Sequence, residues 1–245
     1  MTTSTNNNND GAIKGETGGA LADGLTIVRV LLTPVIMFII YKAWSAKPGD
    51  AEGFVSLDLK LVLLASVLFV IAALTDVLDN YVGGSDLANE RQFGWFDDIA
   101  DSVLIDGTLL ALVWVLNKAG LLHWSFAVPV LILVLRDVVL GLTKGYAFSK
   151  FGLLETRLGD LKSALAMLAT CTLVAAPWLT NLVDSFRAGR SDDVAHVYNS
   201  ASTWVWNTGL VALWIAAILA LYTGFKLLTA KTDMTQTKTT EDTTT

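Results

Sequence analysis

Charged residues and cysteines are scarce in this chain of 245 residues. Charged side chains make up 16% of the sequence, against about 25% in soluble domains, whereas apolar residues make up 53% and the mean hydropathy is +0.54. This balance excludes an ordinary soluble domain and indicates an integral membrane protein. The single cysteine, Cys171, excludes an intramolecular disulfide. The net charge of −6, without any basic stripe, argues against nucleic acid as a partner.

Long apolar runs, by contrast, are abundant. An α-helix needs about 20 apolar residues to cross a bilayer, and six runs are of roughly this length or longer: 25–45, 59–79, 99–117, 122–145, 161–182 and 202–228. We therefore expect an all-α integral membrane protein with six transmembrane helices in one domain, residues 21–230. The polar segments 1–20 and 231–245 predict disordered tails.

The distribution of basic residues predicts which side of the membrane the loops face. Six spans place both termini on one side, which carries ten Lys and Arg residues against six on the other. Because cytoplasmic loops are enriched in Lys and Arg, we expect both termini to face the cytoplasm. The membrane itself is expected to be the cell (inner) membrane. The loop between the second and third spans then also faces the cytoplasm, beside a polar cavity that holds the active site.

Aspartates gather between those two spans, in the stretch LTDVLDNYVGGSDLANERQFGWFDDIAD at residues 74–101. Asp76 and Asp79 are three residues apart, and Asp97 and Asp101 are four apart, so each pair lies on one helical face. Two antiparallel helices can therefore direct four carboxylates to one point. Such carboxylates repel one another unless divalent cations lie between them, and oxygen ligands suit Mg²⁺ or Mn²⁺. The alternative is a pair of solvated helix ends, where acidic residues are common.

The stretch resembles the signature of the CDP-alcohol phosphatidyltransferases, D-x2-D-G-x2-A-R-x8-G-x3-D-x3-D. Counted from Asp76, the further aspartates of the signature fall on Asp79, Asp97 and Asp101. The resemblance implies that these four side chains bind two Mg²⁺ or Mn²⁺ ions. It also implies that Asp101 takes the proton of the acceptor hydroxyl and is thus the catalytic residue.

Other positions of the signature differ. Asn80 replaces the Gly after the second Asp, and Gly83 and Gly84 replace the Ala-Arg pair. In the family these positions lie against the cytidine nucleotide, so the resemblance implies that all three residues bind it, without the positive charge that Arg would supply. The third Gly is displaced by one position to Gly94, which leaves Asp98 as an alternative third metal ligand.

A second match to the family precedes the first span, in DGLTIVRVLLTPV. Asp23, Thr26 and Arg29 have the spacing of the family's Asn-x-x-Thr-x-x-Arg, with Asp in place of Asn. The resemblance implies that Thr26 lies near the nucleotide. The alternative is a helix start that Asp23 caps, with Arg29 extending to the membrane surface.

Basic residues of the fourth and fifth spans form a second candidate site. Arg136 lies deep in an apolar run, where an ionisable side chain needs a partner. The segments VLRDVVLGLTKGYA and ETRLGDLKSALAM resemble the branch of the family that uses glycerol 3-phosphate. The resemblance implies that Arg136, Lys144, Arg157 and Lys162 bind the phosphate of the acceptor. The alternative is that the last three residues are ordinary basic residues of cytoplasmic loops.

The expected function is phosphatidyl transfer in phospholipid biosynthesis. The resemblance implies that CDP-diacylglycerol donates a phosphatidyl group to glycerol 3-phosphate, giving phosphatidylglycerophosphate and CMP, in a homodimer. Another acceptor stays open: phosphatidylglycerol, giving cardiolipin, or inositol phosphate, inositol or serine. A divalent-cation transporter is another alternative. A degenerate member that binds metal without turnover is a third, because Asn80 and Gly84 depart from the signature.

Overall fold

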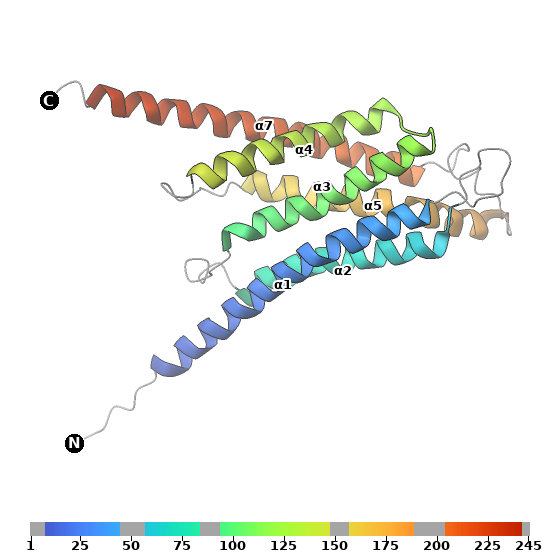
Figure 1. Cartoon of the computed structure of the whole chain (residues 1–245), viewed down its shortest axis with the longest axis horizontal. Coiled ribbons are helices and arrows are strands. Elements are labelled where there is room, and N and C mark those ends of the chain that lie inside the picture. Colours follow the sequence, from blue (N-terminus) through green and yellow to red (C-terminus); the bar gives the residue numbers. More distant parts are fainter. Residues whose placement is uncertain (1–7, 45–56, 84–93, 148–156, 189–203, 242–245) are drawn as a thin grey trace, which may run out of the picture. The chain divides into compact units, whose positions relative to one another are not determined.

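The computed structural model describes the backbone of residues 8–44, 57–83, 94–147, 157–188 and 204–241. Side chains are described for residues 24–44, 57–75, 99–139, 141, 161–183 and 204–225. Within these ranges all regular structure is α-helical, which confirms the all-α class. The described helices are α1 (Asn8–Ala43), α2 (Leu59–Gly83), α3 (Gly94–Lys118), α4 (Trp124–Ala147), α5 (Arg157–Ala188) and α7 (Trp204–Glu241), in the order shown in Figure 1.

Each predicted apolar run lies largely within one of these helices. Among the described residues, four segments are long and apolar enough to cross a membrane: Gly24–Ala43, Ile99–Lys118, Leu161–Val183 and Trp204–Phe225. The apolar part described in α2, Leu59–Thr75, is shorter, and α4 carries Arg136 and Asp137. Large apolar side chains such as Leu31, Leu131 and Phe225 are exposed on these helices, as expected of surfaces that face lipid. An integral membrane protein is therefore supported, whereas a count of six crossings stays a prediction.

The first and last helices extend into the polar segments for which the sequence predicts disorder. Helix α1 begins at Asn8, and α7 continues to Glu241. Extension of an existing helix adds one hydrogen bond for each residue fixed, without a new nucleation step. The domain boundaries at residues 21 and 230 are not tested by this and stay a prediction.

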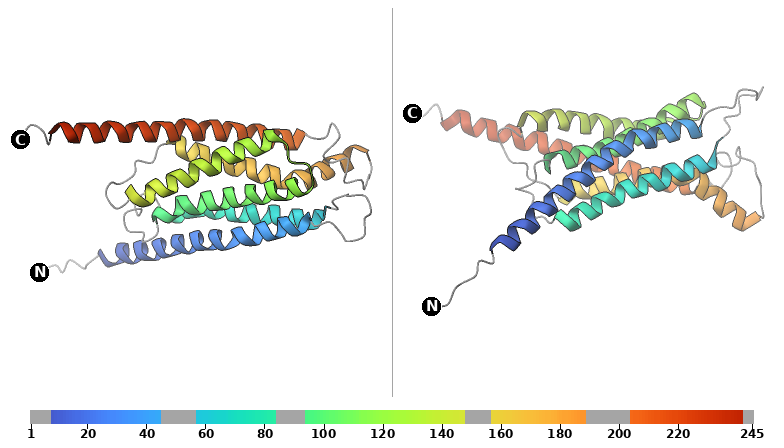
Figure 2. Two further views of the ribbon diagram at one scale, coloured as in Figure 1. Left: turned by 45° about the horizontal axis from the view of Figure 1, so that its top comes forward. Right: turned by 60° about the horizontal axis from the view of Figure 1, so that its bottom comes forward.

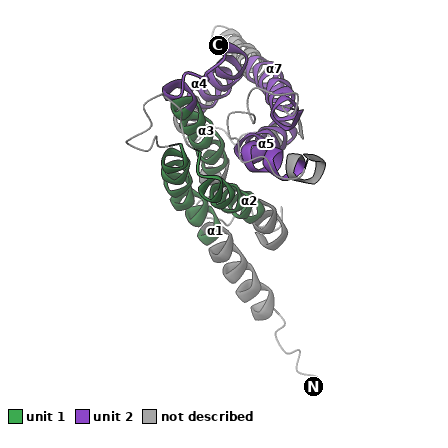
Figure 3. Ribbon diagram, turned by 90° about the vertical axis from the view of Figure 1, so that its right-hand side faces the viewer, with its two compact units in different colours: residues 1–115 green, residues 116–245 purple. Residues whose placement is uncertain are grey.

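The chain divides into two compact units, residues 1–115 and 116–245, coloured green and purple in Figure 3. In the first unit α1 runs beside α2 (Figure 2). Helix α3 approaches α1 closely at Gly107, where a Cβ atom would lie 2.9 Å from Cγ2 of Thr33 and 3.2 Å from Sδ of Met37. Small residues allow such close packing between membrane helices. The core of this unit includes Ile36, Ile40, Phe69, Leu104 and Leu109.

In the second unit α5 and α4 both pack against α7. Gly209 on α7 allows the approach of α5, because a Cβ atom there would lie 2.9 Å from Cγ of Leu173. Trp214 on α7 donates its indole N–H to the carbonyl of Ser125 at 2.8 Å and so fixes the start of α4. The core of this unit includes Phe126, Val130, Leu133, Leu173 and Leu213.

A tight reversal connects α3 to α4. Gly120 has a φ of 68°, a backbone conformation that favours glycine. The amide of Leu121 donates to the carbonyl of Leu116 and that of Gly120 donates to the carbonyl of Asn117, the pattern of a Schellman motif. The loop can therefore be short, and α4 begins at Trp124.

Candidate functional site

In the first unit the catalytic candidate Asp101 is held by a buried arginine. Arg29 on α1 is 0% exposed, and its Nη1 donates to Oδ1 of Asp101 on α3. Its Nε donates to Oγ1 of Thr75 on α2 at 3.4 Å. The guanidinium therefore connects α1 to both α2 and α3. Arg29 does not extend to the membrane surface, so that alternative interpretation of the sequence is wrong.

These contacts bear on the predicted acidic site. Thr75 directly precedes Asp76 in α2, so the Arg29 contacts bring the chain next to Asp76 toward Asp101. Asp79 also lies in α2, and Asp97 lies in α3 one turn before Asp101. The side chains of Asp76, Asp79 and Asp97 lie outside the described residues, and so does Asp98. Where side chains are described, no three His, Cys, Asp or Glu residues gather as a metal site, and the four-aspartate site stays a prediction.

The predicted nucleotide contact Thr26 lies on the same face of α1 as Arg29. The two residues are three apart, which places them one helical turn from each other. Thr26 is buried, with 1% of its surface exposed. Asn80 and Gly83 lie in the last turns of α2, and nothing is described of the Asn80 side chain or of Gly84. The nucleotide contacts at these four residues therefore stay predictions.

In the second unit Asp137 on α4 joins two of the predicted phosphate-binding residues. Nζ of Lys162 on α5 lies 3.2 Å from both carboxylate oxygens of Asp137. Nη1 of Arg136 donates to Oδ1 of the same carboxylate at 2.6 Å, and its Nη2 donates to Oγ1 of Thr223 on α7 at 3.3 Å. The side chains of Lys162 and Asp137 are only 3% and 6% exposed. Buried charges are costly unless they are paired, and this cluster pairs them.

The sequence reasoning found only part of this cluster. It selected Arg136 and Lys162, which the structure brings together, and also Lys144 and Arg157, whose side chains lie outside the described residues. It did not select Asp137, although a carboxylate in an apolar run is itself a signal that a buried cation is near. Thr223 was missed, because a threonine in an apolar helix carries no distinguishing signal.

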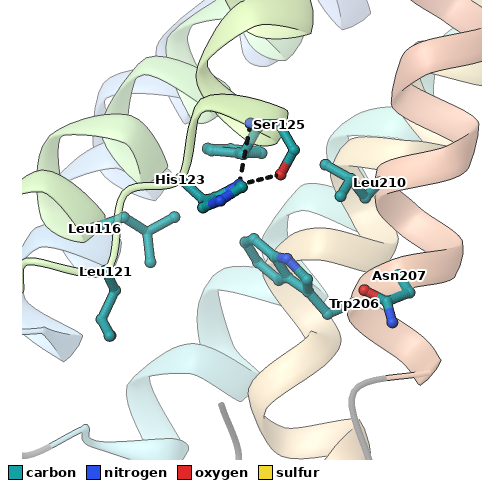
Figure 4. A pocket seen from close by; sticks show the side chains of 8 residues that line it. Leu116, Leu121, His123, Ser125, Trp206, Asn207 and Leu210 are labelled. Carbon is teal, nitrogen blue, oxygen red and sulfur yellow. Dashed lines mark hydrogen bonds between the residues drawn. The ribbon is translucent and has the colours of Figure 1, made fainter. Parts of the chain in front are cut away.

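The second unit also contains a cavity of about 260 Å³ near the starts of α4 and α7, shown in Figure 4. His123 caps the N-terminus of α4: its Nδ1 accepts the backbone N–H of Ser125 at 3.3 Å and lies 2.8 Å from the Ser125 hydroxyl oxygen. Arg136 is eleven residues beyond Ser125, roughly 16 Å along the helix. The cavity is thus separate from the basic cluster. It is lined by Leu116, Leu121, His123, Ser125, Phe126, Trp206, Asn207 and Leu210.

Apolar helices, a buried Arg29–Asp101 pair and a buried cluster around Asp137 define an all-helical membrane protein with two charged sites. Residues 19–222 match the model of the CDP-alcohol phosphatidyltransferases, and the chain belongs to this family. The family resemblance seen in the sequence is thereby confirmed, and with it the enzyme class.

Individual relatives align over most of their length. The chain is 28% identical to the CDP-diacylglycerol–glycerol-3-phosphate 3-phosphatidyltransferase of Cereibacter sphaeroides, over 82% of this chain and 90% of that protein. It is 28% identical to the protein of the same name from Rickettsia typhi, over 86% of this chain and 96% of the relative. A third relative, CDP-diacylglycerol–glycerol-3-phosphate 3-phosphatidyltransferase 2 of Arabidopsis thaliana, is 23% identical over 75% of this chain and 74% of its own length.

Proposed function

We propose that this protein transfers the phosphatidyl group of CDP-diacylglycerol to glycerol 3-phosphate and releases CMP. The product is phosphatidylglycerophosphate, an intermediate of phospholipid biosynthesis. Family membership supports the donor, and the names of the aligned relatives support the acceptor. The observation that carries the proposal is the part-buried cluster in which Lys162 and Arg136 both contact Asp137.

The cluster favours a phosphorylated acceptor. Arg and Lys side chains bind phosphate oxygens by charge-assisted hydrogen bonds, and Arg can do so through two parallel bonds. Glycerol 3-phosphate offers a phosphate with up to two negative charges, whereas inositol and serine offer no phosphate at all. Two basic side chains in an apolar bundle would be a costly feature for a neutral acceptor.

The acidic site is proposed to bind the metal ions that the reaction needs. Asp76, Asp79, Asp97 and Asp101 would hold two Mg²⁺ or Mn²⁺ ions. The donor set fits, because it consists of carboxylates alone, and Arg29 contacts both Asp101 and the residue that precedes Asp76. Bound ions would stabilise negative charge on the attacking and leaving oxygens.

The residues of this chain then have distinct tasks. Asp101 accepts the proton of the acceptor hydroxyl, and Arg29 keeps that carboxylate in place. The hydroxyl oxygen forms a bond to the phosphorus that carries diacylglycerol, while the bond from this phosphorus to the CMP oxygen breaks. Thr26, Asn80, Gly83 and Gly84 lie along the nucleotide, where two residues without a Cβ atom allow a close approach.

We further propose six crossings of the cell membrane, with a polar cavity and both termini facing the cytoplasm. The four strongly apolar segments support four of the crossings, and α2 and α4 supply the other two. Family resemblance implies a homodimer, which cross-linking of the protein in membranes would test. A cysteine placed in either tail of a Cys171→Ser variant should react only with reagents that enter the cytoplasm.

CMP release by the purified protein tests the catalytic proposal. The assay contains CDP-diacylglycerol, Mg²⁺ or Mn²⁺, and one acceptor at a time from glycerol 3-phosphate, phosphatidylglycerol, inositol phosphate, inositol and serine. We expect turnover with glycerol 3-phosphate and its loss on addition of a chelator. Faster turnover with another acceptor would refute the proposed acceptor. No CMP release with any acceptor would favour a degenerate member that binds metal without turnover.

A further inference from the structure

We propose that Asp137 is a positioning residue that holds Lys162 and Arg136 together as one binding unit for the acceptor's phosphate. The inference rests on the proposed function and adds to it a residue that does not itself bind the acceptor. Asp137 lies on α4, Lys162 on α5 and Thr223 on α7, so the unit is assembled from three helices.

The shared carboxylate determines how far apart the two cations lie. Oδ1 of Asp137 accepts from Nη1 of Arg136 at 2.6 Å and lies 3.2 Å from Nζ of Lys162. Because Nη1 of Arg136 and Nζ of Lys162 both contact the same oxygen, the two nitrogens lie close enough for one phosphate group to reach both. Without the carboxylate, two like charges in an apolar surrounding would move apart.

Both basic side chains of the unit suit an anionic ligand. Arg136 and Lys162 each contact the Asp137 carboxylate, and guanidinium and ammonium groups of this kind donate charge-assisted hydrogen bonds to phosphate oxygens.

Arg136 also offers a donor that no described residue uses. Its Nε is buried and has no hydrogen-bond partner among the described residues. Buried polar atoms of this kind are rare and call for an explanation, for which an absent ligand is one ordinary reason. A phosphate oxygen would satisfy this N–H group while Asp137 keeps its bond to Nη1.

Helix α7 keeps the guanidinium in that orientation. The Thr223 hydroxyl donates to the carbonyl of Leu219 at 2.8 Å, which leaves its oxygen free to accept from Nη2 of Arg136. The side-chain stem of Arg136 lies close to Gly224, where a Cβ atom would be 3.5 Å from its Cγ. Arg136 is thus fixed by Asp137 on one side and by α7 on the other.

Kinetics of Asp137→Asn test the inference. Loss of a charge-assisted contact typically changes affinity by roughly ten- to a hundredfold, so we expect KM for glycerol 3-phosphate to rise by that factor. KM for CDP-diacylglycerol should change less than twofold, and Asp137→Glu should restore most of the loss. In a Lys162→Met background the same change should raise this KM by a smaller factor, because only the contact of Asp137 with Arg136 is then left to lose.

Control variants separate positioning from folding. Asp58→Asn removes an exposed carboxylate that caps α2, where Asn caps equally well, and should leave both KM values unchanged. Thr223→Val should raise KM for glycerol 3-phosphate, whereas Thr208→Val should not, although both threonines donate to the carbonyl four residues earlier on α7. An unchanged KM for glycerol 3-phosphate in Asp137→Asn would overturn the inference. So would a double variant, Asp137→Asn with Lys162→Met, in which the rise in this KM equals the product of the two single rises.

A binding measurement keeps the inference distinguishable from the proposed function. Inorganic phosphate should raise the Tm of the wild-type protein and of Asp58→Asn, but not that of Asp137→Asn. If wild-type protein does not use glycerol 3-phosphate but phosphate raises its Tm and not that of Asp137→Asn, the proposed function fails and the proposed role of Asp137 stands. If glycerol 3-phosphate is used and phosphate raises the Tm of Asp137→Asn as much as that of wild type, the role of Asp137 fails and the function stands.

Discussion

Arg29 on α1 and Asp101 on α3 form an ion pair whose arginine is fully buried. The pair joins a residue of the first apolar helix to the proposed catalytic carboxylate, 72 residues later in the sequence. Thr75 on α2 accepts from the same guanidinium, so the pair is anchored on a third helix. We infer that Arg29 sets the position of Asp101 rather than extending to the membrane surface.

Arg29→Met should therefore lower both stability and turnover. Removal of one partner of a buried ion pair typically costs about 3 kcal/mol or more, and misplacement of a catalytic group by about 1 Å can reduce the rate by roughly a hundredfold. The measurements are the Tm of the purified protein and the rate of CMP release. Arg29→Lys should retain part of the stability and part of the turnover. The positive charge remains, but an ammonium group lacks the planar fork with which the guanidinium contacts Asp101 and Thr75 together.

The double variant Arg29→Met/Asp101→Asn separates these two effects. It removes both charges, so its Tm should recover much of what Arg29→Met alone loses, while CMP release stays absent. Recovery of turnover along with stability would contradict the assignment of Asp101 as the proton acceptor. No recovery of Tm would mean that the stability lost in Arg29→Met comes from contacts of Arg29 other than its pairing with Asp101.

Asp101→Asn by itself should abolish detectable turnover, because an amide cannot accept the proton of the acceptor hydroxyl. Its neighbours should stay in place, since the amide is nearly the same size and its oxygen can still accept from Arg29. Asp58→Asn is the matched control, as it makes the same chemical change at an exposed position and should keep wild-type rates. Wild-type CMP release by Asp101→Asn would remove this residue from the mechanism.

The sequence predicted the helices well because each coincides with a long apolar run. It also selected the acidic and basic residues, because charges are rare in such runs and their spacing is informative. It did not predict how the charges pair. Lys162 meets Asp137 across 25 residues and Arg136 meets Thr223 across 87, contacts that depend on how each helix is rotated about its axis. Periodicity within a single helix does not contain that information.

The metal proposal predicts a graded response to divalent ions. Asp76→Asn removes one of four carboxylates, so turnover should fall by at least about a hundredfold and need more Mn²⁺ for half-maximal rate, since affinity depends on the number of charged ligands. The measurement is CMP release against Mn²⁺ concentration for wild-type protein and variant. A Mn²⁺ dependence of Asp76→Asn identical to that of the wild type would refute the assignment of Asp76 as a ligand.

Gly209 should be required for the contact between α5 and α7. In Gly209→Ala the new Cβ atom would lie 2.9 Å from Cγ and 3.1 Å from Cδ2 of Leu173, so the buried Leu173 side chain or one of the two helices must shift, at a typical cost of about 1–3 kcal/mol. We expect a lower Tm and weaker stabilisation by phosphate, because Lys162 and Thr223 lie on these two helices. Gly141→Ala is the control, since nothing lies within 4 Å of its Cβ position and alanine in a helix is favoured over glycine by up to about 1 kcal/mol. A Tm for Gly209→Ala equal to that of Gly141→Ala would show that the two helices do not approach as closely as the structure has them.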